Sequence, residues 1–275
     1  MDAAEFNRTR DYVQRQCGIR VGDEKKYLIE TRLTTLMVEQ GCSDLIQLCE
    51  KAEKDGSNVL RDKIVDAMTT NETLWFRDRT PFDILRNSVL PRLAEELKQG
   101  RRRSVRIWCA ACSTGQEPYS VAMVVDGLSN RFPSLNKSTV RITATDISPT
   151  VLFLAMAGRY DSFAVQRGLP PDTRDRYFKH VGKVWILDER IRSMVTFKKL
   201  NLQDDFTSLG RQDIVLCRNV LIYFDEVLKH DIVNRITNLL TPYGLLFVGA
   251  SESLLKYQGS LTMVREGRGV YYHRA

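Results

Sequence analysis

The 275-residue sequence predicts an α/β fold: a small all-helical region precedes a sheet that is largely parallel and has helices on both faces. Residues 1–75 carry apolar side chains at helical spacing, for example at Leu60, Ile64 and Met68. From Val105 onward, short apolar runs alternate with amphipathic segments, which is typical of parallel strands joined by crossover helices. The hydrophobic content of 43% indicates a globular protein with a well-packed core.

The composition bears on the cellular compartment of the protein and on metal binding. No apolar run approaches the roughly 18 residues of a membrane span, and the first residues lack the pattern of a signal peptide. The six cysteines are scattered, which fits buried reduced thiols in a cytoplasmic protein. Cys109 and Cys112 match CxxC, but neither a second CxxC nor a paired histidine motif accompanies them, so we predict no metal site.

The net charge of +7 is unevenly distributed: residues 1–80 carry −2 and residues 81–275 carry +9. Such an excess is either a solvated surface or a means of attracting an acidic partner, which could be a nucleic acid or an acidic protein surface. Charge alone does not choose between these interpretations.

The elements follow in order. Thr80 and Pro81 predict an N-cap and a first helical residue, opening a helix that runs toward Gly100 with a restart or kink at Pro91. We therefore expect a helical domain over 1–75, a linker helix over 76–103 and an α/β domain over 104–275. Within the last domain, the expected strands are 105–109, 140–145, 214–217 and 245–249, the expected helices are 118–128, 149–158 and 225–240, and a turn is expected over 241–244.

Residues from about 160 to 200 interrupt this alternation. The β-rich runs Val184–Leu187 and Ile191–Phe197 flank the polar residues 188–190, which predicts a hairpin inserted as a small β-subdomain. The residues 263–272 also resemble a hairpin.

Ligands of parallel sheets bind beyond the carboxyl ends of the strands. Residues 111–118 join the first strand to a helix there, and a helix N-terminus offers backbone N–H groups to a small ligand. Since the loop has neither a GxGxxG nor a GxxxxGK[ST] pattern, a ligand with a cationic, non-phosphorylated end suits it better than NAD or ATP. The alternative is a plain connection.

Two further segments are candidates for a site. Asp146 ends the second strand, where a carboxylate either accepts hydrogen bonds from a ribose or caps the next helix; both roles can coexist. Residues 69–78 lie at the junction of the two domains, where a cleft can form. The simpler interpretation is an aromatic hinge made by Trp75 and Phe76.

Four blocks, taken together and in order, strongly resemble the CheR family of chemotaxis receptor methyltransferases: Thr69–Asp78, Ala111–Ser120, Ala144–Ser148 and Arg218–Phe224. The resemblance implies a Rossmann-like domain that uses S-adenosyl-L-methionine (SAM) and releases S-adenosyl-L-homocysteine (SAH). The implied reaction is methyl esterification of glutamate side chains on the cytoplasmic helical domain of chemoreceptors, for chemotactic adaptation. It also implies a cytoplasmic enzyme associated with receptor arrays. The alternative is a non-catalytic SAM-binding regulatory module of the same fold.

The same resemblance implies roles for individual residues. The residues placed around the cofactor are Asn71, Thr73, Arg77 and Glu117 at its methionine end, Asp146 at its ribose, and Asn201, Leu202, Arg218 and Asn219 along the rest of its wall. Arg77 and Tyr223 are placed nearest the transferred methyl group. A glutamate carboxylate, with an ordinary pKa of about 4.3, is already ionised at neutral pH, so the reaction needs no general base.

Partner recognition departs from the family pattern in two places. The second helix, with Lys25, Lys26 and Arg32, is less basic than the usual receptor-docking helix, although we still expect these residues to assist docking. The tip between His180 and Val184 is short, so we expect no requirement for a receptor C-terminal pentapeptide. A nucleic-acid methyltransferase is disfavoured, because Arg218 and Asn219 follow the fourth strand in place of an Asp/Asn-Pro-Pro-aromatic loop.

Overall fold

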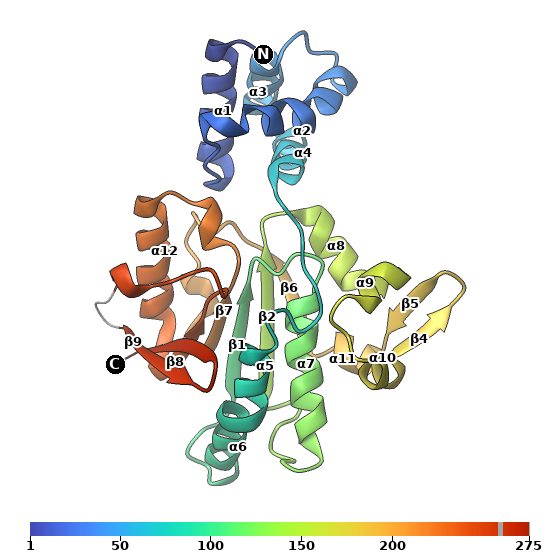
Figure 1. The fold of residues 1–275 in the computed structure, drawn as a ribbon, viewed down its shortest axis with the longest axis vertical. Helices are drawn as coiled ribbons and strands as arrows, with labels where there is room; N and C mark the ends of the chain where they lie inside the picture. The colour runs from blue at the N-terminus through green and yellow to red at the C-terminus, as the bar shows by residue number, and fades with distance from the viewer. Residues whose placement is uncertain (258–260, 275) are drawn as a thin grey trace.

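The computed structural model describes residues 1–257 and 261–274 and begins with four α-helices that pack around their own core (Figure 1). Asp2 caps the first helix by accepting the N–H of Glu5, and Gly18 ends it in the left-handed conformation. The all-helical character predicted for this region is confirmed. The helices are α1 Ala3–Cys17, α2 Lys26–Glu39, α3 Leu45–Lys54 and α4 Val59–Met68, with a 3₁₀ turn at Asp23–Lys25.

An irregular segment, residues 69–79, leads into a rod made of α5 (Thr80–Ile84), a π-helical turn (Leu85–Val89) and α6 (Leu90–Lys98). The prediction that Thr80 is the N-cap was wrong: Arg79 holds that position, and Thr80 is the first helical residue. The predicted irregularity at Pro91 takes the form of the π turn that precedes it. Proline has no N–H to donate to the preceding turn, so the ordinary helical ladder cannot continue through it.

The central sheet has seven strands in the order β6-β2-β1-β7-β8-β10-β9. The first five are parallel, whereas β10 is antiparallel to both of its neighbours. Ile107 of β1 lies opposite Ile142 of β2 and Ile214 of β7, so these three strands end at one edge. The strands are β1 Val105–Ala110, β2 Val140–Asp146, β6 Val195–Lys199, β7 Gln212–Cys217, β8 Leu240–Phe247, β9 Leu261–Glu266 and β10 Gly269–Arg274.

Alternating residues of β1 point into different cores, because Ile107 packs on one face of the sheet and Trp108 on the other. Helix α7 (Gln116–Ser129), helix α8 (Pro149–Ala157) and the α5–α6 rod contribute to the first core. Helix α12 (Glu226–Leu239) contributes to the second. The predicted α/β fold, with helices on both faces, is confirmed.

Strand β8 is longer than predicted. Residues 241–244 were expected to form a turn before it, yet Leu240 already pairs with Gln212, and the register shifts before Leu245 pairs with Ile214. The turn residues therefore form an irregularity inside the strand, where Tyr243 has a φ of 62°.

The inserted subdomain contains a three-stranded sheet in the order β3-β5-β4. The predicted pairing of 184–187 with 191–197 was wrong: Val184–Leu187 pairs with Phe178–Val181, and Val195–Lys199 joins the edge of the central sheet. Asp188 accepts the N–H of Arg190, which makes the polar residues start a helix in place of a hairpin tip. The elements are β3 Arg159–Tyr160, α9 Ser162–Gln166, α10 Pro171–Tyr177, β4 Phe178–Val181, β5 Val184–Leu187 and α11 Glu189–Arg192.

The second predicted hairpin is confirmed as β9 and β10, which pair antiparallel across residues 267–268. Within residues 1–257 and 261–274, no helix has the length and apolar character needed to cross a membrane.

Candidate active site

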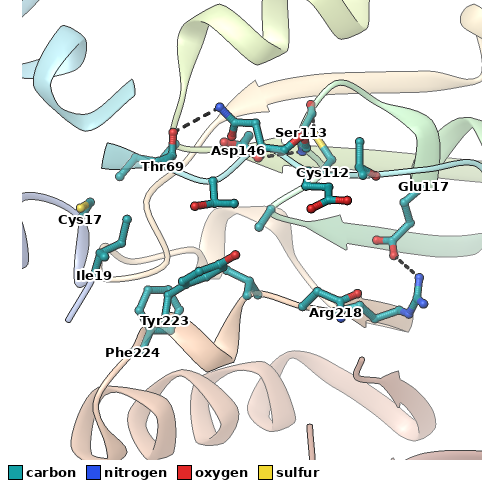
Figure 2. A pocket seen from close by; sticks show the side chains of 18 of the residues that line it. Cys17, Ile19, Thr69, Cys112, Ser113, Glu117, Asp146, Arg218, Tyr223 and Phe224 are labelled. Carbon is teal, nitrogen blue, oxygen red and sulfur yellow. Dashed lines mark hydrogen bonds and ion pairs between the residues drawn. The ribbon is translucent and has the colours of Figure 1, made fainter. Parts of the chain in front are cut away.

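A cavity lies between the carboxyl edge of the sheet and the helical domain (Figure 2). Its walls come from the junction segment, the loop between β1 and α7, the end of β2 and the loop after β7. Cys17 and Ile19, at the end of α1 and just beyond it, close it from the helical domain. The sequence carried no signal for these last two residues, because only the tertiary fold brings them to the cavity.

The loop after β1 is shaped by unusual backbone angles. Ala111, Ser113 and Gly115 have φ values of 55°, 49° and 92°, a region that non-glycine residues rarely adopt. At Gly115 a Cβ atom would lie 3.0 Å from Cβ of Ala155 and 3.1 Å from the ring of Tyr119, so glycine also fits the space. Helix α7 begins at Gln116, two residues before the predicted start. Strained loops of this kind concentrate at binding sites.

Asp146 is buried at the end of β2, with 6% of its surface exposed. Its Oδ2 accepts the N–H of Ser113 at 2.8 Å, and its Oδ1 accepts the N–H of Ser148 at 3.0 Å. Burial raises the pKa of the carboxyl group, against the effect of these backbone N–H donors. The alternative that Asp146 caps the next helix was wrong, because Ser148 is the N-cap and accepts the N–H of Val151.

Arg218 is the electrostatic centre of the site. Its side chain is 1% exposed and donates to Glu117 Oε2, Asp78 Oδ2 and the carbonyl oxygen of Arg77, each at 2.7 Å. Burial raises the pKa of Glu117, and the neighbouring Arg218 opposes that rise. One guanidinium thus bridges two carboxylates and fixes the backbone beside Arg77.

The junction segment is held from three sides. Arg32 of α2 donates from Nη1 to the carbonyl oxygen of Met68 at 2.7 Å and from Nη2 to Thr70 Oγ1 at 3.1 Å. The N–H of Trp75 donates to the carbonyl oxygen of Arg167 in the inserted subdomain at 3.1 Å. From the loop after β1, Ser113 Oγ donates to the carbonyl oxygen of Asn71 at 2.8 Å.

Both interpretations of this segment hold in part. Trp75 is fully buried and packs edge-to-face against Tyr160 and Phe178, as an aromatic hinge would. The polar residues beside it line the cavity, including Arg77, whose Nη1 donates to the carbonyl oxygen of Glu72 at 3.2 Å.

Most of the predicted site residues line this cavity together: Asn71, Thr73, Arg77, Glu117, Asp146, Arg218, Asn219 and Tyr223. Asn201 and Leu202 are outside the lining formed by the described residues. Asn201 Nδ2 donates to the carbonyl oxygen of Gln16 at 2.9 Å, and Leu202 is buried in the core beneath α12. Their cofactor roles stay predictions.

The apolar part of the wall, formed by Ile147, Val220 and Phe224, was not predicted. These residues lie within the blocks Ala144–Ser148 and Arg218–Phe224, so their position was the available signal. The docking role expected of Lys26 and Arg32 stays a prediction, and both side chains also have backbone acceptors. Arg32 holds the junction segment, and the ammonium group of Lys26 donates to the carbonyl oxygen of Met1.

Cys109 and Cys112, the residues of the CxxC pattern, are both buried. Burial raises the pKa of each thiol well above its ordinary value. In the part of the chain that the structure describes, no group of three or more His, Cys, Asp or Glu side chains could hold a metal ion.

The arrangement suits one kind of ligand. Buried carboxylates at Glu117 and Asp146 gain from a cationic group and from hydroxyl donors, which offset the cost of their desolvation. The Nε of Arg218 is buried without a partner among the described residues. Ile147, Val220 and Phe224 offer an apolar surface to a flat ring.

Comparisons with known proteins cover nearly the whole chain. Residues 4–69 match the family model "CheR methyltransferase, all-alpha domain", and residues 71–270 match "CheR methyltransferase, SAM binding domain". The chain is 45% identical to chemotaxis protein methyltransferase 1 of Pseudomonas aeruginosa over 270 residues, covering 98% of this chain and 97% of that protein. It is 43% identical to chemotaxis protein methyltransferase Cher2 of Pseudomonas putida over 269 residues, with coverage of 98% and 97%.

Proposed function

The chain belongs to the CheR methyltransferase family, and from this premise we propose that it methylates glutamate side-chain carboxylates of chemoreceptors. It is a SAM-dependent methyltransferase of chemotaxis, and SAH is the product of its cofactor. The observation that carries the glutamate proposal is the convergence of Arg77, Glu117, Asp146 and Tyr223 on one cavity. We further propose that it works in the cytoplasm at receptor arrays, through its partners.

Binding uses the buried acidic groups. In our proposal Asp146 accepts hydrogen bonds from the ribose hydroxyls, and Glu117 lies against the cationic methionine end. Arg218 holds Glu117 through a 2.7 Å ion pair, so this carboxylate stays in place without a ligand. The other proposed cofactor contacts are Asn71, Thr73 and Asn219.

In the proposed methyl transfer, the protein contributes by orienting the acceptor carboxylate. SAM supplies an activated methyl group on a sulfonium ion, and the acceptor carboxylate is ionised without help. Arg77 and Tyr223 hold that carboxylate in line with the methyl group and keep water from its place, which accounts for a site that needs no general base.

The acceptor is a protein helix and not a nucleic acid. The loop after β7 supports this proposal, since Arg218 is buried in ion pairs with Glu117 and Asp78. We propose that no receptor C-terminal pentapeptide is needed, because only Gly182 and Lys183 separate β4 from β5.

The test is to incubate the protein with SAM labelled on its methyl group and membranes that contain receptors. Label that is released from receptor bands by mild base identifies a carboxyl ester. Binding of SAH without receptor labelling would instead identify a non-catalytic module of the same fold. Labelling that persists after truncation of the receptor tail supports pentapeptide independence, whereas its collapse contradicts it.

A further inference from the structure

Glu252, which follows β8, joins two loops at the carboxyl edge of the sheet. Its Oε2 accepts the backbone N–H groups of Asn219 and Gly249, each at 2.7 Å. Its Oε1 accepts the N–H of Ile222 at 3.3 Å. Hydrogen bonds to a charged acceptor are stronger than neutral ones, so one carboxylate ties the loop after β7 to the loop after β8.

Two of these hydrogen bonds hold the two ends of one turn in the loop after β7. Asn219 and Ile222 are its two ends, and Asn219 has a φ of 58°, which costs energy in a residue other than glycine. The neighbouring Gly249 leaves room for this turn: a Cβ atom there would lie 2.6 Å from Nδ2 of Asn219 and 2.8 Å from Oε2 of Glu252. The strained turn therefore exists because the second loop supports it.

Tyr223 is the next residue after the bracketed turn. Its N–H donates to the carbonyl oxygen of Val220 at 3.2 Å, and its own carbonyl oxygen accepts the N–H of Arg20 at 2.8 Å. Asn219, Val220 and Tyr223 line the cavity, whereas Glu252 is outside the lining formed by the described residues. Glu252 therefore reaches the cavity mainly through this turn; its charge also contributes to the raised pKa of Glu117.

We propose that Glu252 is a positioning residue for methyl transfer, because it fixes the Asn219–Ile222 turn and so aims Tyr223 into the cavity. This inference rests on the proposed function, in which Tyr223 orients the acceptor carboxylate. If Glu252 positions Tyr223, its contribution to turnover depends on the tyrosine hydroxyl. A residue that only stabilises the fold would contribute equally with or without that hydroxyl.

The experiment is a double-mutant cycle on receptor methylation, with Glu252→Ala made in the wild-type and the Tyr223→Phe proteins. In the wild-type protein, loss of the bonds to Asn219 and Gly249 lowers kcat by about tenfold or more. In the Tyr223→Phe protein the same change lowers kcat by less than about threefold, because the hydroxyl it positions is already gone. Glu252→Gln keeps one oxygen that can accept the two shorter bonds, so we expect it to retain more turnover than Glu252→Ala. If Glu252→Ala does not fold, Glu252→Gln takes its place in the cycle.

Asp55→Ala is the matched control. The Asp55 carboxylate also accepts two backbone N–H groups, those of Ser57 and Leu60, each at 3.0 Å, but it lies in the helical domain and not at the active-site cavity. We expect the kcat of the Asp55→Ala variant to stay within about twofold of the wild type.

Equal losses from the Glu252 change in both tyrosine backgrounds would overturn the proposal, and so would a matching loss in Asp55→Ala. A wild-type protein that binds SAH but labels no receptor contradicts the proposed function itself, and the role of Glu252 in transfer with it.

Discussion

Gly168 lets the inserted subdomain touch the backbone of the junction segment, and Gly168→Ala tests that contact. Gly168 has a φ of 89°, and a Cβ atom built on it would lie 2.1 Å from the carbonyl oxygen of Trp75. The left-handed conformation alone costs alanine about 1–2 kcal/mol. To reach normal contact, the Trp75 peptide must move by roughly 1 Å, and overpacking of this kind costs a further ~1–3 kcal/mol.

We therefore expect Gly168→Ala to lower the free energy of unfolding by about 2–5 kcal/mol, which urea denaturation measures. Arg77 lies two residues after Trp75, so the same displacement moves the guanidinium. A misplacement of roughly 1 Å can cost about 100-fold in rate, and we expect a loss of that order in receptor methylation.

Gly182→Ala provides the matched control, because Gly182 has a similar φ of 62° but no atom within 4 Å of the built Cβ. It carries the conformational cost alone, about 1–2 kcal/mol, and leaves methylation unchanged. If the two alanine variants lose the same unfolding free energy and the same activity, the insertion does not position Arg77 and the reasoning fails.

Four further predictions concern the cavity. Tyr223→Phe should lower turnover more than it weakens SAH binding, since the hydroxyl acts during transfer; wild-type turnover with receptor would make Tyr223 a structural residue. Asp146→Asn should weaken SAH binding about ten- to a hundredfold in calorimetry. Burial raises the pKa of Asp146, and ribose hydroxyls favour its ionised form, so SAH binding by the wild type should release protons and weaken as the pH falls through that raised pKa; equal heats in buffers of different ionisation enthalpy would argue against it. Arg32→Ala removes the bonds to Met68 and Thr70 and should weaken SAH binding, whereas the exposed Lys25→Ala should not; a loss confined to receptor affinity would return Arg32 to a docking role.

The sequence was sufficient for the parts of the site that lie within one short block. The strand ends, the loop after β1 and the Arg218–Phe224 block are local patterns, and parallel strands bring their carboxyl ends to one edge by geometry alone. The pairing of Val184–Leu187 was not predictable in this way. A polar run between two β-rich runs fits a hairpin tip and a capped helix equally well, and the choice depends on the side chain of Asp188.

The roles of the other residues depend on long-range hydrogen bonds, which the sequence does not reveal. Arg32 and Lys26 are basic residues of α2, and their charge indicates a surface role. Two of their acceptors, the carbonyl oxygens of Met68 and Met1, are backbone groups that no side-chain pattern reveals. Among the described residues, the hydrogen bonds of Glu252 likewise come from backbone N–H groups.

The position of Arg77 depends on all three parts of the fold. Phe76, Asp78 and Arg79 have φ values of 48°, 65° and 45°, and such residues persist only where their surroundings hold them, at a cost of about 1–3 kcal/mol each. The helical domain holds the start of this segment through Arg32, the insertion holds its middle through Trp75, and the catalytic domain holds its end through Arg218. A segment anchored in this way has little regular structure of its own, because its hydrogen bonds are used to connect the domains. That explains why an irregular stretch, and not a helix or strand, carries the arginine proposed to orient the acceptor.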